Sequence, residues 1–460
     1  MSTTSLNETV VQEVPDVHEA GKHTLQNFSI ALILVGYYAI STFMLIMARY
    51  VPGGRPVLPF TILFCLFFAV LIIGKVFRGD IHVYVSPTIC VLIFITLMCF
   101  TNNPYTYSSI EKSFYFVAVT VIPCIYIYLC DISSDDYQQI SNFLIFFSII
   151  LICVVLYAYA NVGTLDARVT SQKESGLYEI GVARSLTIAT LVYIYSFMSK
   201  KGIIKKILTL ALILTAIALI TFTGKRQALM AIVLAPLAVN LINMKRPFKI
   251  VISIAAAATF IALFYYIILP VMLESGPLSK TKMAEYLERQ YYDKSNITSM
   301  AGRVDAYKIT LAVIAEKPLI GIGFNNFGKY TKQKYHLRNE QGDPHNLWLS
   351  IMVELGVVTF IFTMFLLFSF IKNILLAVWR YTSSSHKYEV ILLCQLSVVV
   401  LLFSMVGLTL GRGAQIFFIM PVLMEKMHQG LRYQDQKSLT VSDQSSHESN
   451  SQLESAYRRI

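Results

Sequence analysis

The sequence predicts an all-α integral membrane protein with about 12 transmembrane helices. Three observations support this class. Of the 460 residues, 55% are hydrophobic and only 14% are charged, whereas a soluble domain carries about 25% charged residues. The mean hydropathy is +0.60. The apolar residues also form separate runs, several of them close to the roughly 20 residues that an α-helix needs to cross a bilayer.

Twelve apolar runs define the expected helices. The first begins at Phe28 and is too long for the apolar core of a cleavable signal peptide, so we expect it to remain as a helix. The seventh and eighth are joined by a very short turn, and the twelfth is short enough to be a partial span. The runs cover residues 28–48, 57–76, 83–100, 113–130, 142–160, 182–199, 203–221, 226–243, 250–272, 346–371, 389–410 and 413–427.

Cations in the short loops predict that both termini are cytoplasmic, because such loops carry an excess of Lys and Arg. One acidic loop, with Asp131, Asp135 and Asp136, departs from this pattern. The resulting division is a cytoplasmic tail (1–27), helices 1–9 (28–272), a periplasmic loop (273–345), helices 10–12 (346–427) and a disordered, Ser/Gln-rich cytoplasmic tail (428–460). We therefore expect an inner-membrane protein with its site on the periplasmic face.

Composition argues against several kinds of site. The seven cysteines all lie in apolar runs, which is typical of core residues rather than disulfides or metal ligands. Metalloprotease, Walker A and dinucleotide-binding motifs are missing from the sequence, so it predicts no metal and no cofactor. Much of the net charge of +11 is explained by the cytoplasmic loops and by basic residues in the long external loop, so it needs no nucleic-acid partner; membrane lipids are the expected surroundings.

The long loop between helices 9 and 10 is expected to be partly helical. Residues 279–293 have a helix-forming composition after a possible cap at Ser279. Residues 301–318 form a second, amphipathic helix that Pro318 ends, with Arg303 and Tyr307 on one side of it. A glycine-hinged turn, "LIGIGFNNFGKY", follows.

The loop returns to the membrane at "GDPHN" (342–346), where a polar start meets an apolar helix. We expect Asp343 to cap this helix and Pro344 to be its first residue. His345 and Asn346 then fall in the first turn, where the helix dipole lowers the pKa of the histidine and keeps it neutral, as a general base must be. Alternatively, His345 only helps to cap the helix, or the free N–H groups of this turn bind a phosphate. Gly356 shares the side of His345 and permits close packing.

The few charged residues at the ends of the spans are the other candidates for a functional site. With cytoplasmic termini, five cations fall on the side of the long loop: Arg184, Lys225, Arg226, Arg303 and Arg412. Guanidinium groups match the oxygens of a diphosphate. The alternative is that they bind lipid headgroups or extend to the membrane surface.

These residues resemble a known family. "GRVDAYKITLAVIAEKPLIGIGFNNF" (302–327), followed by "PHNLWLSIMVELGVVT" (344–359), is similar to the signature of the O-antigen ligase and O-antigen polymerase superfamily. In the ligases a His-Asn pair is followed by nine residues and Gly-x-x-Gly or Gly-x-x-Thr, as in His345-Asn346 and Gly356 to Thr359. "TFTGKRQALM" (221–230) resembles the turn that carries an arginine of the family, here Arg226, or Lys225 if the alignment slips by one residue. Arg412 in "GRGAQIFF" resembles a less fixed late arginine.

The resemblance implies a metal-independent glycosyltransferase with an undecaprenyl-diphosphate-linked glycan as donor. It carries the family's essential histidine and two arginines over to His345, Arg226 and Arg303. We therefore expect His345 to act as the base and Arg226 and Arg303 to bind the diphosphate, with Arg184, Arg412 and Lys225 as weaker helpers. As supporting residues we name Asn346, Asp343, Gly356 and Tyr307. In a ligase the acceptor is lipid A–core, and in a polymerase it is a second lipid-linked glycan. A protein O-glycosyltransferase, a lipid-linked sugar flippase and a non-catalytic scaffold remain the alternatives.

Overall fold

The computed structural model describes most of the expected spans. It describes residues 17–36, 57–78, 86–101, 107–162, 176–199, 202–223, 225–243, 255, 259, 263, 270–271, 296–335, 344, 346–381, 387–406 and 416–430. All regular secondary structure in these residues is helical. Six helical stretches in them are long and apolar enough to cross a membrane. The all-α membrane class is therefore confirmed, whereas the count of twelve spans and the side on which the long loop lies stay predictions.

The helices begin and end close to the apolar runs of the sequence. The ninth expected span (250–272) and the helix expected at 279–293 lie almost wholly outside the described residues. The elements are α1 (Val17–Ala31) with η1 (Leu32–Gly36), α3 (Val57–Phe77), α4 (Pro87–Thr101), α5 (Tyr107–Phe116) with η2 (Val117–Val121) and α6 (Ile122–Tyr128), α7 (Ser134–Val162), α8 (Gly176–Ser199), α9 (Ile203–Phe222), α10 (Arg226–Asn243), α14 (Asn296–Glu316), α15 (Phe327–Tyr335), α16 (Leu347–Tyr381) and α17 (Lys387–Val406).

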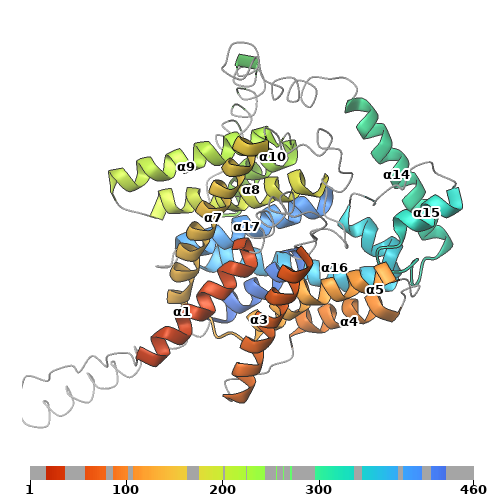
Figure 1. Cartoon of the computed structure of the whole chain (residues 1–460), viewed down its shortest axis with the longest axis horizontal. Coiled ribbons are helices and arrows are strands. Elements are labelled where there is room, and N and C mark those ends of the chain that lie inside the picture. The colour runs from red at the N-terminus through yellow and green to blue at the C-terminus, as the bar shows by residue number, and fades with distance from the viewer. Residues whose placement is uncertain are drawn as a thin grey trace, which may run out of the picture.

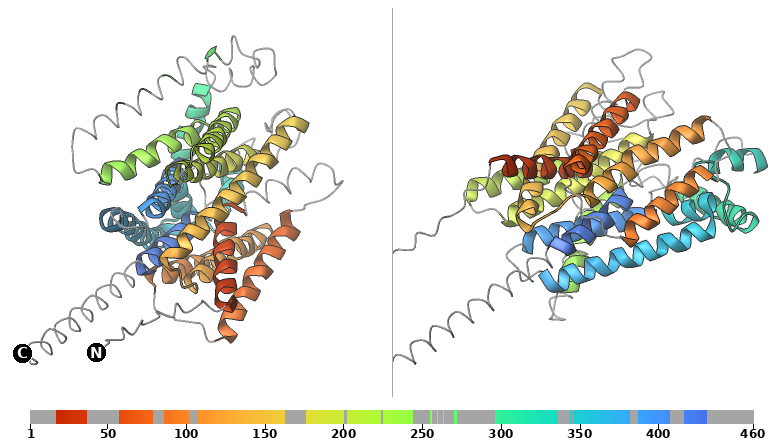
Figure 2. Two further views of the ribbon diagram at one scale, coloured as in Figure 1. Left: turned by 90° about the vertical axis from the view of Figure 1, so that its left-hand side faces the viewer. Right: turned by 90° about the horizontal axis from the view of Figure 1, so that it is seen from below.

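The spanning helices lie alongside one another, and α14 and α15 lie together at one end of this bundle (Figures 1 and 2). Helix α14 packs against α16, so it is attached to the bundle rather than separate from it. Helix α10 packs against α8, α16 and α17. The helices that carry candidate cations (α8, α10 and α14) therefore lie next to α16 or next to one another.

The last apolar run, expected at 413–427, is buried inside the bundle and does not lie at its edge. Residues 416–430 form a helix, and twelve of these fifteen residues are buried. The ring of Phe417 contacts that of Trp348 at a centroid distance of 5.2 Å, and the ring of Phe418 contacts that of Phe116 at 5.6 Å. This segment is therefore a core helix enclosed by other helices, a placement that explains its short length better than a broken span at the edge of the bundle.

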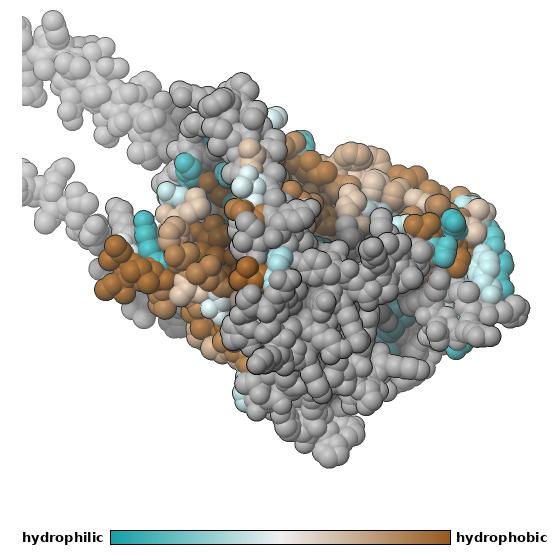
Figure 3. Space-filling model, turned by 90° about the horizontal axis from the view of Figure 1, so that it is seen from above, coloured by the Kyte–Doolittle hydropathy of each residue, from teal (hydrophilic) through white to brown (hydrophobic). Residues whose placement is uncertain are grey.

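Other helices present their apolar side chains to the outside, as lipid-facing helices do. Helix α9 is the most exposed of the six candidate spans, with only 22% of its apolar window buried. Helix α3 exposes Leu63, Leu66 and Val70. Figure 3 shows broad hydrophobic areas on the described part of one face. In water such a surface would be an aggregation site, whereas in a bilayer it is the expected exterior.

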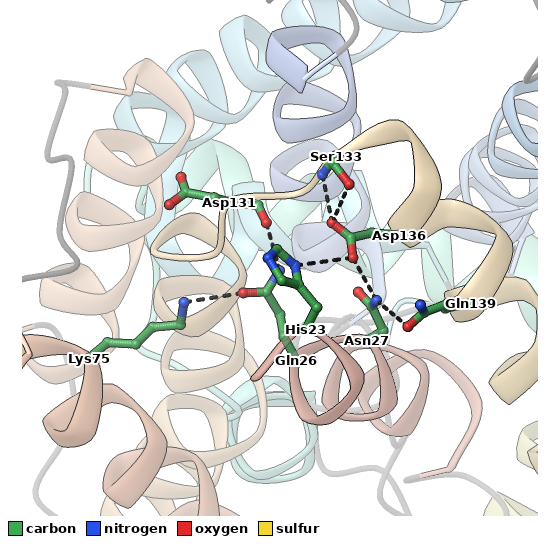
Figure 4. A network of polar contacts seen from close by, with 8 residues as sticks. All are labelled: His23, Gln26, Asn27, Lys75, Asp131, Ser133, Asp136 and Gln139. Carbon is green, nitrogen blue, oxygen red and sulfur yellow. Dashed lines mark hydrogen bonds and ion pairs between the residues drawn. The ribbon is translucent and has the colours of Figure 1, made fainter. Parts of the chain in front are cut away.

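A polar network explains the acidic loop that departs from the charge pattern (Figure 4). The N–H and hydroxyl of Ser133 both donate to Oδ2 of Asp136 at 2.7 Å. Ser133 directly precedes α7 and Asp136 is its third residue, so the pair forms part of a capping box. Oδ1 of Asp136 accepts a hydrogen bond from Nδ2 of Asn27 at 2.7 Å and lies 3.3 Å from Nδ1 of His23.

The same network ties α1 to two more elements. Gln26 donates to the carbonyl of Asp131 at 2.7 Å and accepts a hydrogen bond from Lys75 of α3 at 3.2 Å. Because Asp136 is only 3% exposed, its carboxylate is a structural centre of this end of the bundle and not a surface charge. A loop-charge rule that counts residues without their partners cannot detect this difference.

Candidate active site

The start of α16 is capped by a different residue from the one expected. Oδ1 of Asn346 accepts hydrogen bonds from the backbone N–H groups of Trp348 at 2.9 Å and Leu349 at 3.1 Å. This is the geometry of an N-cap, and the helix begins at Leu347. The expectation that Asp343 caps the helix, with Pro344 as its first residue, is therefore wrong. His345 precedes the cap instead of lying in the first turn.

The cap residue also joins α16 to the end of α17. Nδ2 of Asn346 donates a hydrogen bond to the carbonyl oxygen of Met405 at 2.9 Å. The carbonyls in the last turn of a helix have no partner within that helix, so they are available to such a donor. Since both lone pairs of its Oδ1 are used by backbone N–H groups, Asn346 positions the start of α16 rather than offering an acceptor to a substrate.

Arg184 of α8 reaches the same turn of α17. Its guanidinium carbon lies 5.5 Å from the centre of the ring of Phe403, a cation–π contact. Phe403 and Met405 are two residues apart, so Arg184 and Asn346 meet α17 within one helical turn. This brings one predicted phosphate-binding arginine to the end of the bundle where α16 begins.

The other predicted cations are carried by neighbouring elements. Lys225 lies in the short turn after α9; its carbonyl accepts a hydrogen bond from the N–H of Ala228 at 3.0 Å, which starts α10. Arg226 is the first residue of α10. Arg303 lies in the first half of α14. Of the sequence-predicted residues, His345, Asp343 and Arg412 lie outside the described residues, as do the side chains of Arg226 and Arg303.

Helix α14 faces the bundle with the side on which Tyr307 and Thr310 lie. Tyr307 is half-buried, and Thr310 is fully buried with its hydroxyl donating to the carbonyl of Ala306 at 2.6 Å. Val313 packs with Ile322 and Phe327 of the following segment and with Val353 of α16. The buried side of α14 therefore packs on α16 and on the loop that leads from α14 to α15.

That loop is bonded to a break in α16 at Gly356. The backbone of Gly356 has φ 83° and ψ 172°, which is not helical. The N–H of Val357 donates to the carbonyl of Pro318 at 2.7 Å. The N–H groups of Ile322 and Gly323 in turn donate to the carbonyls of Val353 at 3.0 Å and Glu354 at 2.9 Å. The loop thus replaces hydrogen bonds that a continuous helix would make within itself.

Glu354 holds the loop through its side chain as well. Its Oε2 accepts a hydrogen bond from the backbone N–H of Asn325 at 3.0 Å, and the residue is only 4% exposed. Asn325 has φ 54°, a left-handed conformation that asparagine tolerates better than most residues. The partner of Glu354 lies in a loop 29 residues away, so local sequence does not identify it.

The site contains no evident metal centre in the part of the chain that the structure describes, where no group of three or more His, Cys, Asp or Glu side chains is arranged to hold a metal ion. Among the described residues, the cation Arg184 and the capped start of α16 contact the same last turn of α17. The helix that carries Arg303 is bonded to the same α16 through its C-terminal loop.

One family of known proteins matches the region of the chain that holds most of these residues. No curated protein matches the chain closely enough to count as a relative. Residues 210–364 match a family described as O-antigen ligase. The matched region runs from α9 to α16 and contains Lys225, Arg226, Arg303 and the His345–Asn346 pair, whereas Arg184 and Arg412 lie outside it. The chain is a multi-pass membrane protein whose residues 210–364 match the O-antigen ligase family, and this match supports the O-antigen ligase and O-antigen polymerase superfamily.

Proposed function

We propose that the protein is an O-antigen ligase of the inner membrane. It transfers a glycan as a block from undecaprenyl diphosphate to lipid A–core at the periplasmic face, a step of lipopolysaccharide biosynthesis. The observation that carries the proposal is the meeting of Arg184 and Asn346 on the last turn of α17. A cation therefore contacts the same turn of α17 as the cap residue that follows His345, in a chain whose residues 210–364 match the O-antigen ligase family.

The proposed reaction needs a base and a stabilised leaving group. His345 takes the proton from the acceptor hydroxyl, and the acceptor oxygen attacks the anomeric carbon of the donor sugar. The bond between that carbon and the diphosphate oxygen breaks, and its electron pair leaves with the undecaprenyl diphosphate. Arginines stabilise the negative charge that develops there, a role that requires no metal ion. We assign this role to Arg226 and Arg303, assisted by Arg184, Arg412 and Lys225.

The fixed start of α16 supports this assignment for His345. General-base catalysis requires the base to lie within hydrogen-bond reach of the proton it takes. Asn346, the residue after His345, is hydrogen-bonded both to its own helix and to α17, so the backbone beside His345 is held from two directions. We further propose that Pro344, which is buried, restricts the chain on the other side.

Acceptor identification tests the proposal. The purified protein in lipid nanodiscs is incubated with undecaprenyl-diphosphate-linked glycan and either lipid A–core or a second lipid-linked glycan. Extension of lipid A–core with release of undecaprenyl diphosphate supports a ligase. Extension of the lipid-linked unit identifies a polymerase instead. Movement of the donor across the membrane without release of undecaprenyl diphosphate would identify a transporter and overturn the transferase.

Two variants connect the activity to the assigned residues. His345→Ala removes the base, and we expect transfer to fall by roughly 10²-fold or more, in line with the usual contribution of a general base. Lys205→Ala is the matched control, because Lys205 is an exposed cation near the start of α9, at the end of that helix far from Lys225. Full activity in His345→Ala, with both variants inserted in the membrane, would remove His345 from the mechanism.

A further inference from the structure

The tip of the loop between α14 and α15 exposes two large apolar side chains. Leu319 is 63% exposed and Ile320 is 58% exposed. Their backbone is held against α16 at the Gly356 break, because Pro318 accepts a hydrogen bond from Val357. An exposed pair of this kind costs free energy in water, at about 25 cal/mol for each Å² of apolar surface.

The break at Gly356 is also where α16 changes its surroundings. From Leu347 to Val357 no residue of α16 is exposed, so this part is enclosed by protein. The first exposed residue is Val358, at 39%, followed by Ile361 at 49% and Phe365 at 65%. The apolar loop tip therefore adjoins the first turn of the surface that α16 presents to lipid.

The length of α16 locates the membrane boundary near this break. The helix from Leu347 to Arg380 has 34 residues, which at about 1.5 Å per residue is far longer than the roughly 30 Å of a hydrocarbon core. The part from Val358 to Trp379 measures about 32 Å by the same rise, and it matches the hydrocarbon thickness. Trp379 is exposed and is followed by Arg380, an arrangement typical of the opposite interface.

A cluster of aromatic and charged residues joins the two helices that flank the loop tip. The ammonium of Lys317 lies 5.7 Å from the centre of the ring of Tyr330, and that of Lys334 lies 5.8 Å from the same ring. The hydroxyl of Tyr330 donates to Glu316 at 2.9 Å. Tyrosine and lysine together are characteristic of the headgroup level of a membrane. The apolar pair at the loop tip is thus followed along the chain by residues of the kind found at the headgroup level, while α16 beyond the break exposes apolar side chains such as Phe365.

We propose that Leu319 and Ile320 insert into the acyl chains of the lipid leaflet on the side of α14 and α15. The Gly356 break then lies at the boundary of the hydrocarbon, with Lys317 and Tyr330 among the headgroups. The enclosed part of α16 is about 14 Å long from Leu347 to Leu355 at the helical rise. It would project beyond that boundary and carry its N-cap residue, Asn346, out of the hydrocarbon. This inference concerns lipid contact and does not depend on which reaction the protein performs.

Tryptophan quenching tests the proposal in the full-length protein. We would prepare Ile320→Trp in nanodiscs whose lipids carry bromine on the acyl chain near the carbonyl end, and compare its fluorescence with that of the unaltered chain, which has 2 tryptophans. The expected result is loss of most of the added emission in the brominated lipid, with little loss on adding aqueous iodide. Leu319→Trp is the second variant, in case the first does not fold.

A tryptophan on α15 serves as the control. Lys332→Trp places the same probe on an exposed, polar position of α15, and its added emission should respond to iodide and not to bromine. If the added emission of Ile320→Trp and Leu319→Trp also responds to iodide and not to bromine, the loop tip lies in water and the proposal fails. Transfer activity is not measured, so this failure would leave the proposed reaction untouched.

Discussion

Gly356 lies directly against the backbone of Leu319: a Cβ built on the glycine would come within 2.0 Å of the Leu319 carbonyl oxygen and within 2.6 Å of the N atom of Ile320. The contact is with backbone, so no side-chain rotation can relieve it. Gly356 also has a φ and ψ that are essentially restricted to glycine. Two independent constraints therefore demand glycine where the loop meets α16.

Gly356→Ala should accordingly destabilise the protein. The strained φ alone costs about 1–3 kcal/mol, and the displaced loop would add to that. We expect a clearly lower melting temperature in detergent micelles. Gly74→Ala in α3 is the control, because nothing lies within 4 Å of its Cβ position and alanine is favoured over glycine in a helix. Equal melting temperatures for both variants would mean that the loop is not docked in this way.

Removal of the Glu354 carboxylate should release the loop without unfolding the bundle. Glu354→Ala leaves the N–H of Asn325 without its acceptor, which costs about 1–3 kcal/mol for a buried group. Glu354→Gln keeps an oxygen at the same place and should lose less. Hydrogen exchange measured on peptides from 319–330 should rise strongly in the alanine variant and modestly in the glutamine variant. Unchanged exchange in both would show that the side-chain contact does not hold the loop.

Two substitutions of Asn346 should separate its contact with α17 from its capping of α16. Asn346→Asp keeps the oxygen that caps α16 but loses the amide that donates to Met405. Asn346→Ala loses both contacts, and loss of the cap alone costs about 1 kcal/mol. We expect the order of thermal stability to be the unaltered chain, then aspartate, then alanine. An aspartate variant no more stable than the alanine variant would contradict the capping role.

The positions of the helices could be predicted from the sequence because membrane spans depend on local composition. Thus α3, α9 and α10 begin and end within about two residues of their apolar runs, well inside the usual uncertainty of helix ends. Burial could not be predicted in the same way, since residues 416–424 are as apolar as a lipid-facing helix. Composition does not say whether apolar neighbours are lipid tails or other helices.

The details of the candidate site depend on tertiary contacts, and this is why some of them were not predictable. Asp343 and Asn346 are both good capping residues, and the bond from Asn346 to the carbonyl of Met405 on another helix cannot be seen in the local sequence. The break at Gly356 requires the carbonyl of Pro318 as a partner, so residues 346–371 alone read as one continuous helix. The short turn before α10 and the end of α14 before Pro318 were predictable, because both follow from local signals.

The polar contacts between α14 and α15 predict a pH window for the attachment of α15. Glu316 accepts hydrogen bonds from Lys334 and Tyr330, and these donors lower the pKa of its carboxyl group below the usual 4.5. The stabilisation is therefore complete above the unfolded-state pKa and is lost as the pH falls through the lowered folded-state pKa. The hydrogen bond to Glu316 raises the pKa of Lys334 above 10.5, so its contribution is lost only as the pH rises through that raised pKa.

Helix α15 should consequently be held best across the neutral range and held somewhat less tightly at both extremes, most accessibly in acid. Limited proteolysis by an acid-active protease, followed over 327–335, should show faster cleavage as the pH falls below about 4.5, the ordinary glutamate value. Glu316→Gln should abolish this acid dependence, because the group no longer titrates. Asp305→Asn is the matched control: its carboxylate is an exposed partner of Lys308 at 3.9 Å, and such surface pairs contribute little. Acid-dependent cleavage that persists unchanged in Glu316→Gln would assign the pH effect to another group.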